Sequence, residues 1–309
     1  RTRVGSERDT MRYPGSVIGR ESDRRAVIRL GIRCAAFLTV LAALLAATAS
    51  SGRAAEASFL IGAYPLELEH QTAAGKSVSG TFQVYNGTDD TLHFTTTLTD
   101  WQISPDGDLE LAPSGSVSRS ASAWVRVSPR EFDVPAKGTF TVRYAISVPA
   151  TEGTGIGGEY RSMIVAQSQA LPSRAGGIMI AGAVAIKVFV QIGAPAPGLA
   201  VTDLREVSRP LSSGDAQPPS FQVQVKNTGN VHLRPAGKLE VRQGDRLLYQ
   251  LLVNEAAATV LPDATRVFTV SLPEALPAGD YQVIALFDYG GAKLAGGRLN
   301  HRVPPQPGQ

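Results

Sequence analysis

The stretch that decides the fold is GGIMIAGAVAIKVFVQIGAP, residues 176–195. The even-numbered positions from Ile178 to Ile192 are almost all β-branched, a side-chain type that strands prefer and helices tolerate less well. The odd-numbered positions are mostly small and include one cation, Lys187. A spanning helix needs about 20 apolar residues and disfavours a central lysine. The pattern therefore predicts a long β-strand at the end of a first domain.

This strand has two interpretations that do not exclude each other. Its Ile/Val face is expected to fill the core of its own domain. A final strand can also lie at the margin of its sheet, where a long apolar edge either aggregates or pairs with a strand from a partner. We therefore predict that residues 178–192 offer unpaired backbone to a second polypeptide.

The chain after residue 55 reads almost entirely as short strands. Alternating runs rich in Thr, Val, Ser, Ile and Tyr are separated by the turn sequences NGTDD, SPDGD and VPAKG. Many short strands at this spacing predict a β-sandwich. The strands expected in the first half cover residues 79–86, 92–101, 122–128, 138–148 and 158–168.

The second half of the chain repeats the order of the first. TFQVYNGT, residues 81–88, is echoed by SFQVQVKNTGN at 220–230, and GGEYRSMIV at 157–165 by AGDYQVIAL at 278–286. Between these pairs, VPAKGTFTVRYAISVP is echoed by LPDATRVFTVSLP. The fold class predicted is therefore all-β, with two immunoglobulin-like sandwiches in tandem. The first copy is expected to carry an insertion at about 102–121.

Two tyrosines occupy equivalent places in the two copies. Tyr160 and Tyr281 each follow a Gly-containing turn and open an apolar strand. An immunoglobulin-type sandwich places its tyrosine corner there, with the hydroxyl bonded to nearby backbone. The domain bounds predicted from these patterns are 1–55 for an upstream segment and signal peptide, 56–193 and 199–304 for the sandwiches, 194–198 for a Pro/Gly linker, and 305–309 for a tail.

The front of the chain has the layout of a secretory signal peptide. RRAVIRLGIR is positive, CAAFLTVLAALLAATA at 34–49 is apolar, and small residues follow it. The apolar run is shorter than a membrane span, so we predict cleavage after Ala54, Ala55 or Ala57 and no membrane span in the mature chain. A start at Met11 or Val27 would give a leader of more ordinary length. The protein is expected to be exported, to a periplasm or a cell surface.

Charge and cysteine content narrow the classes of function. Residues 1–55 hold ten Arg and four acidic residues, which leaves 20 basic and 23 acidic residues in the rest of the chain. Without a basic patch, nucleic acid is not an expected partner. The single cysteine, Cys34, lies in the predicted leader, so burial rather than disulfides must stabilise the mature protein.

No constellation for catalysis or metal binding is evident. The four histidines, none of them at metal-ligand spacing to another, are His70, His93, His232 and His301. SPDGDLE has alternating acids but lacks the rest of a calcium loop, and it reads better as a solvated turn. We find no nucleophile elbow, phosphate loop or zinc-protease motif. The protein is therefore predicted to be non-enzymatic, with no catalytic residues, metal or cofactor.

Three segments of the first domain resemble the N-terminal domain of the periplasmic pilus-assembly chaperones, the PapD-like family. FQVYNGTDDTLHFTTTLTDW resembles their second and third strands, and WVRVSPREFDVPAKGTFTVRY resembles the family's segment of pattern sP..f.l.pg..q.vr. AIKVFVQIGAP resembles the end of their last strand, where a lysine precedes an apolar–aromatic pair. The resemblance covers about residues 58–195.

In that family the last strand donates alternating apolar residues to an incomplete pilin, while two basic residues hold the pilin's terminal carboxylate. The resemblance implies that Lys187 is one of those basic residues. The other would be an Arg in the first strand, but FLIGAYPLELEH at 59–70 contains none. The predicted partner-binding residues are Ile178, Ile180, Val184, Ile186, Lys187, Val188 and Val190.

The second domain resembles a different family, the Gram-positive cell-surface proteins that interact with WxL-type proteins. VKNTGNVHLRPAGKLEV and LPAGDYQVIALFDYGG fit the pattern of their second sandwich. Those proteins usually end in a membrane helix, whereas this sequence ends in PPQPGQ. The function predicted first is a pilus-chaperone-like protein that binds exported subunits by β-strand pairing. The alternative is an adhesion or cell-wall-binding module whose partner is a surface protein or a wall polymer.

Overall fold

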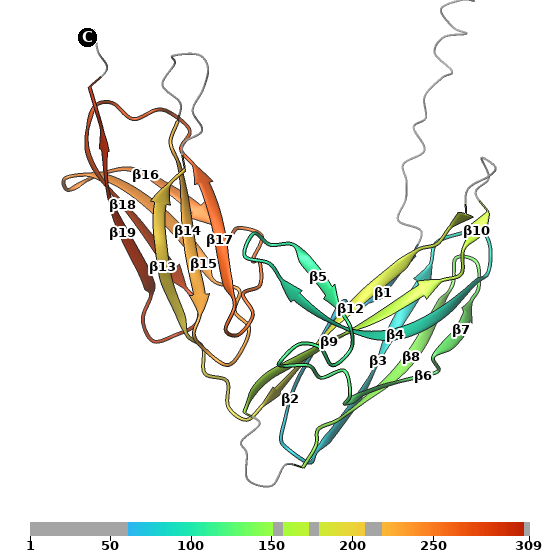
Figure 1. The fold of residues 1–309 in the computed structure, drawn as a ribbon. Helices are drawn as coiled ribbons and strands as arrows, with labels where there is room; N and C mark the ends of the chain where they lie inside the picture. The colour runs from blue at the N-terminus through green and yellow to red at the C-terminus, as the bar shows by residue number, and fades with distance from the viewer. Residues whose placement is uncertain (1–60, 151–156, 173–178, 208–217, 306–309) are drawn as a thin grey trace, which may run out of the picture. The chain divides into compact units, whose positions relative to one another are not determined.

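The computed structural model describes residues 61–150, 157–172, 179–207 and 218–305. All of its regular elements are β-strands, which form two sandwiches within one compact unit, Phe59–Gln309 (Figure 1). The predicted all-β class with two tandem immunoglobulin-like sandwiches is therefore confirmed. The predicted leader lies outside the described residues, and among those described no helix is long and apolar enough to cross a membrane.

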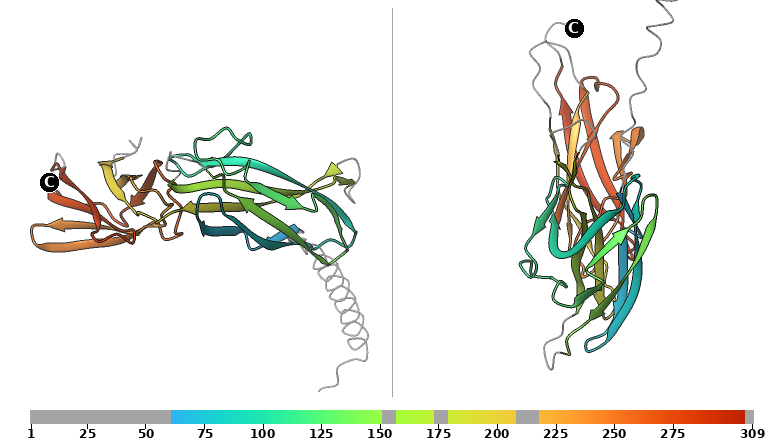
Figure 2. Two further views of the ribbon diagram at one scale, coloured as in Figure 1. Left: turned by 90° about the horizontal axis from the view of Figure 1, so that it is seen from below. Right: turned by 90° about the vertical axis from the view of Figure 1, so that its right-hand side faces the viewer.

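The first sandwich has two main sheets (Figures 1 and 2). One sheet has the order β1-β3-β8-β6 and the other the order β2-β12-β9-β4-β5, with β7 also paired to β4. A small hairpin of β10 with β11 adjoins them. The strands are β1 (Ile61–Tyr64), β2 (Glu67–Thr72), β3 (Ser77–Asn86), β4 (Leu92–Ile103), β5 (Leu109–Ala112), β6 (Val125–Ser128), β7 (Glu131–Val134), β8 (Thr139–Ser147), β9 (Gly158–Ser168), β10 (Leu171–Pro172), β11 (Met179–Ile180) and β12 (Ala183–Ile192).

The second sandwich is built from a three-stranded sheet, β13-β14-β17, and a four-stranded sheet, β16-β15-β18-β19. Its hydrophobic core is separate from that of the first sandwich and includes Phe221, Leu239 and Phe287. The strands are β13 (Leu199–Glu206), β14 (Ser220–Asn227), β15 (Ala236–Gln243), β16 (Arg246–Val253), β17 (Thr265–Ser271), β18 (Gly279–Asp288) and β19 (Ala295–Val303).

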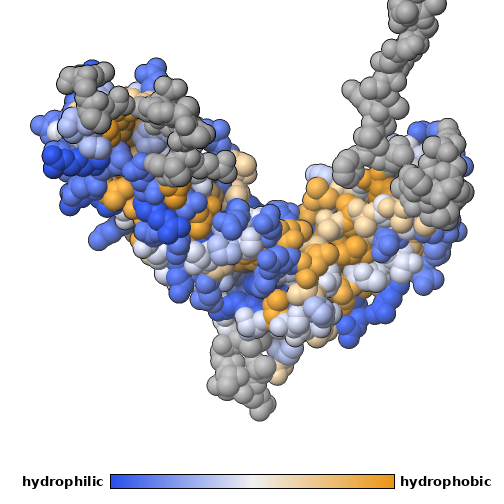
Figure 3. Space-filling model, turned by 45° about the horizontal axis from the view of Figure 1, so that its top comes forward, coloured by the Kyte–Doolittle hydropathy of each residue, from blue (hydrophilic) through white to orange (hydrophobic). Residues whose placement is uncertain are grey.

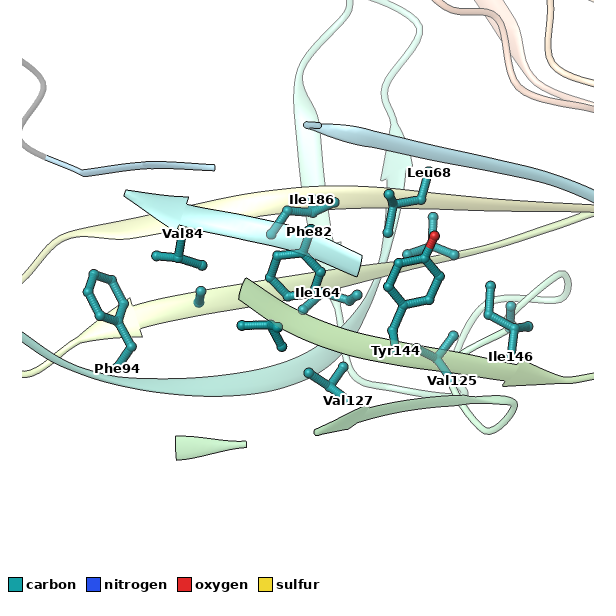
Figure 4. Close-up of a cluster of buried hydrophobic side chains, with 14 of the residues drawn as sticks. Leu68, Phe82, Val84, Phe94, Val125, Val127, Tyr144, Ile146, Ile164 and Ile186 are labelled. Atoms are coloured by element: carbon teal, nitrogen blue, oxygen red, sulfur yellow. The ribbon is translucent and has the colours of Figure 1, made fainter. Parts of the chain in front are cut away.

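The core of the first sandwich lies between its two main sheets. Alternate residues of each strand point inward, so that Phe82 and Val84 of β3 face Ile164 of β9 and Ile186 of β12 (Figure 4). The even-numbered Ile/Val face of β12 contributes to this core from Val184 to Ile192. The prediction that this face fills its own domain is therefore confirmed.

A buried asparagine closes the end of an equivalent strand in each sandwich. Asn86 and Asn227 are both fully buried, and each Nδ2 donates to backbone carbonyls of a later loop, Val134 O in one case and Val260 O in the other. Each Oδ1 accepts the backbone N–H two residues onward, at 2.9 Å and 2.8 Å. These matching bonds give the sequence repeat between 81–88 and 220–230 a structural counterpart.

The tyrosine corner is present in the second sandwich. The Tyr281 hydroxyl donates to the carbonyl of Pro277 over 2.7 Å. For Tyr160, the backbone four residues earlier lies outside the described residues, so the same bond stays a prediction there. The Tyr160 ring packs against Trp124 with a centroid distance of 4.5 Å.

The insertion predicted at 102–121 forms a hairpin and a loop at the far margin of the second sheet. β5 pairs with the end of β4, and the loop that follows is bonded to the buried carboxylate of Asp100 by Val117 N and by Ser120 Oγ and Ser122 Oγ. Burial raises the pKa of Asp100, but the hydrogen bonds from the two serines and the loop backbone lower it more, so the net direction is down. The insertion therefore lies at the opposite side of the sheet from β12.

The buried asparagines provide a test of the fold. Replacing Asn86 by Ala removes a buried side chain that donates to the carbonyls of Val134 and Pro135 and accepts from Thr88 N, so we expect a loss of about 2–3 kcal/mol in the free energy of unfolding. The measurement is urea denaturation, with the exposed Asn300→Ala as the control. Equal midpoints for the two variants would show that the asparagine does not secure the end of β3.

Candidate strand-accepting edge

β12 is paired along its whole length on one side and along only part of its length on the other. β9 runs antiparallel to it from Ala183 to Ile192. On the opposite flank β2 runs parallel to it, but only from Lys187 to Ile192. The predicted open edge over residues 178–192 is therefore corrected, since Lys187–Ile192 has a strand of the same chain on each side.

β2 covers only part of β12 because the chain passes from one sheet to the other near the start of the first sandwich. β1 pairs with β3 in one sheet, whereas β2 pairs with β12 in the other. Pro65 lies between the two strands and has no N–H to continue a ladder. The single first strand expected over 59–70 is thus divided, and β2 begins to cover β12 where Lys187 N donates to Leu66 O at 2.9 Å.

Two residues of β12 direct their backbone groups away from β9 without a strand partner. Antiparallel pairs alternate between residues that bond to the neighbour and residues that bond away from it. Because Ser168 N donates to Gly182 O, the even-numbered residues bond to β9. The N–H and C=O groups of Ala183 and Ala185 therefore point to the other flank, where no described strand pairs with them.

Side chains beside this flank are exposed or partly exposed. Ala183 and Ala185 are exposed, and Val184 is partly buried against the core. Tyr64 and Leu66 stand next to the point where β2 meets β12 and are 76% and 53% exposed. Hydrophobic residues also reach the surface elsewhere, as the face drawn in Figure 3 shows. A strand added at this flank would meet apolar side chains as well as free backbone.

The seven predicted partner-binding residues fall into three groups in the structure: those described without side chains or not at all, those beside the open flank, and those beside β2. Ile178 lies outside the described residues, and Ile180 is described only by its backbone, in β11 paired to β10. Val184 and Ile186 lie on the half of β12 with an open flank, but Ile186 is fully buried in the core of its own sandwich. Val188 and Val190 are also fully buried there, and β2 covers their flank, as it does that of Lys187.

Lys187 is held in an ion-pair network that sequence reasoning missed. Its Nζ lies 3.1 Å from Glu67 Oε1 and 5.7 Å from the centroid of the Trp101 ring. Arg234, from the segment between β14 and β15, approaches the other oxygen of Glu67 at 2.5 Å and Glu69 Oε1 at 3.1 Å. A second basic residue does stand near Lys187, but it comes from the second sandwich and shares an internal carboxylate.

The environment of Glu67 favours its charged form. Burial raises its pKa, but the hydrogen bond and charge of Lys187, together with the charges of Arg234 and His232, hold the pKa below its usual range. The residue borders a cleft of about 470 Å³, which is also lined by Ile103 and Leu109. A carboxylate from a partner would have to displace Glu67 from its two cations.

Aromatic and apolar side chains cover the outer face of β12 beside this network. Trp101 and Phe189 meet edge to face at 5.5 Å, and Leu261 completes a small buried cluster with them and Met163. The His232 ring stacks on Phe189 at 4.3 Å and its Nδ1 contacts Glu159 at 2.5 Å. Both faces of the C-terminal half of β12 are therefore occupied within the chain.

The described ranges contain no group of three or more His, Cys, Asp or Glu placed to hold a metal ion. His70 is bonded to Tyr144 at 2.8 Å, His93 to Asp133 at 2.7 Å, and His301 to Glu206 at 3.2 Å.

Burial of Ile186 generates a first prediction for this site. An Asp at this position would place a carboxylate in the core, so we expect Ile186→Asp to lose about 4 kcal/mol or more and to unfold the first sandwich. The exposed neighbour gives the control, because Ala185→Asp should melt close to the wild type. If Ile186→Asp melts normally by circular dichroism, its side chain is free to enter a partner.

The lowered pKa of Glu67 generates a second prediction. A pKa that is lower in the folded state than its usual value of 4.5 contributes stability above pH 4.5, and this contribution is lost as the pH falls through the lower folded value. The difference in urea midpoint between wild type and Glu67→Gln should therefore be largest at neutral pH and shrink below pH 4.5. A difference that does not change with pH would contradict the ionic role of Glu67.

Comparisons with known proteins place the fold near solved pilus chaperones. No family model matches the chain, and no curated protein matches it in sequence. The class 5 fimbriae chaperone CfaA is 12% identical with a TM-score of 0.43, and the alignment covers 79% of this chain and 99% of that one. The Pseudomonas aeruginosa CupB2 chaperone is 12% identical with a TM-score of 0.38 and coverage of 78% and 100%.

A chain of the CsuC–CsuE chaperone–tip subunit complex from Acinetobacter baumannii Csu pili is 14% identical, with a TM-score of 0.40 and coverage of 77% and 97%. The chain is thus similar to periplasmic pilus chaperones over most of its length. The resemblance to WxL-interacting proteins stays a prediction.

Proposed function

We propose that this chain is an exported, non-enzymatic binding protein that pairs with a β-strand of another exported subunit at the outer flank of Ala183–Ile186. The observation that supports this most directly is the pair of outward backbone positions, Ala183 and Ala185, beside which no described strand runs. Backbone pairing of this kind gives affinity through main-chain hydrogen bonds, while side-chain contacts give specificity.

The side chains around this flank define what the partner must offer. Val184 presents a partly buried apolar surface, and Tyr64 and Leu66 present exposed apolar surfaces where β2 takes over the flank. A partner strand with apolar residues at alternate positions would contact Val184 on one face. A sandwich subunit that lacks one of its own strands exposes such a strand at its open edge, as the sequence resemblance to pilus chaperones implies.

The site proposed is smaller than the one expected from sequence. Donation of side chains from Ile186, Val188 and Val190 would empty the core of the first sandwich, since each is fully buried there. Donated apolar residues must therefore come from the N-terminal side of Ile186, where Val184, Ile180 and Ile178 alternate in the sequence. Export rests on the predicted leader at 1–55.

A proline substitution tests the backbone pairing. Ala185→Pro removes an N–H that no described residue uses, so the sandwich should fold, while binding of a purified exported subunit whose sandwich lacks one strand should weaken about tenfold or more. Ala185→Thr is the matched control, because it keeps the N–H and favours a strand. Affinity is measured by isothermal titration calorimetry and folding by circular dichroism.

Equal affinities of Ala185→Pro and the wild type for the subunit would contradict the proposal that a partner strand pairs with this flank. If the wild type also fails to bind such a subunit but is retained on isolated cell wall, the adhesion or wall-binding alternative would be favoured instead.

A further inference from the structure

We propose that the second sandwich carries a separate interaction surface, the outer edge of β16, and that its occupant is the same edge of a second copy of this chain. β16 pairs with β15 on one side, and in the described part of the chain no strand pairs with its other side. Figure 1 shows β16 with the other strands of the second sandwich. This inference concerns a different domain from the flank of β12 and does not depend on it.

The C-terminal part of this edge, Tyr249–Val253, lacks the charges, prolines and bulges that normally prevent pairing. Proteins protect edge strands with charged residues, prolines or cover from another segment. Arg246, the first residue of β16, is its one charged residue, and the sequence LLYQLLV from Leu247 to Val253 contains no charge and no proline. The pairing with β15 moves from Val241↔Tyr249 to Arg242↔Leu247, so Leu248 is an extra residue in β16, and this bulge limits the regular edge to Tyr249–Val253.

The core face of this edge is apolar, and its outer face exposes two leucines. Tyr249 and Leu251 face the core and are only partly buried there. On the outer face Leu252 is 63% exposed and Leu247 is 42% exposed. Packing within the sandwich therefore leaves much of the apolar surface of β16 in contact with water, a cost that a strand laid alongside would reduce.

The other outer strands of the second sandwich differ from β16. β13 carries Asp203 and Arg205, and β19 carries Arg298 and Arg302. β17 carries Arg266, and its Val267 N–H already donates to Pro105 O at 2.8 Å. A strand that approached these edges would meet charges or an occupied donor, so β16 is the edge best suited to accept one.

Charge and symmetry favour a second copy as the occupant. A strand laid against an uncharged apolar edge must itself be free of charge, because a charge there would be desolvated without a partner. The Tyr249–Val253 segment of β16 meets this requirement, and in a second copy it is present at the same concentration as its target. A two-fold axis perpendicular to the sheet keeps core-facing residues on the core side in both copies.

That symmetry predicts which residues meet. With the axis at Leu251, the middle of Tyr249–Val253, or one residue earlier at Gln250, that residue lies opposite its own counterpart, and the two four-stranded sheets become one continuous sheet. The amide of Gln250 can both donate and accept, so a Gln250 pair satisfies itself. No like charges are brought together within the paired segment.

Sedimentation velocity over a range of concentrations tests the proposal. We expect a reversible dimer for the full chain. Leu252→Glu should weaken dimerisation at least tenfold without lowering the melting temperature, because Leu252 is exposed and lies opposite Lys238 of β15. Leu294→Glu, at a position 57% exposed but outside any strand, should leave the dimer intact and is the matched control.

Cross-linking locates the contact. In a Cys34→Ser background, which removes the only natural thiol, Gln250→Cys or Leu251→Cys should form a disulfide dimer under mild oxidation. The proposal is overturned if the chain is a monomer up to about 1 mM, or if Leu252→Glu dimerises like the wild type. It is also overturned if Ala185→Pro abolishes the dimer, since the contact would then involve β12 instead.

Discussion

The parallel pairing of β2 with β12 determines what the first sandwich can offer to other molecules. From Lys187 onward, β2 occupies the flank of β12 that a terminal strand would otherwise expose, and this places Glu67 beside Lys187. β2 does not extend alongside the residues of β12 that precede Lys187, because the segment before β2 in the sequence, β1, pairs with β3 in the other sheet. The position of this change of sheet therefore fixes both the length of the open flank and the neutralisation of its nearest cation.

The same pairing explains why the core does not need a partner to be complete. Ile186, Val188 and Val190 are fully buried between the two sheets, with β2 adding Leu68 from the covered side. Since the sequence after the predicted leader has no cysteine, burial of this kind must stabilise the domain without disulfides. A binding function at β12 is thus restricted to its N-terminal end, where a partner adds contacts and replaces none.

Much of this fold could be predicted from local patterns. Alternation of residue type along β12 identified its core face, and the repeat around Asn86 and Asn227 identified two copies of one architecture. The prediction that was wrong is the open edge over residues 178–192, because it concerned which strand lies beside β12. Its neighbour β2 comes from the opposite end of the domain, and no local signal in ELEHQT indicates a parallel partner. Arg234 was missed for the same reason, because its approach to Glu67 depends on how two distant segments meet.

The two edges proposed as binding surfaces, the flank of β12 and the edge of β16, differ in a way that suits them to different partners. The flank of β12 offers only two outward backbone positions, Ala183 and Ala185, so main-chain bonds alone give little affinity and recognition must rely on neighbouring side chains such as Val184. β16 offers a longer edge with apolar residues on both faces but little chemical variety. An edge of the second kind discriminates poorly among apolar strands. Self-association would therefore protect β16 from unselective pairing while leaving the short, selective flank of β12 free for a client.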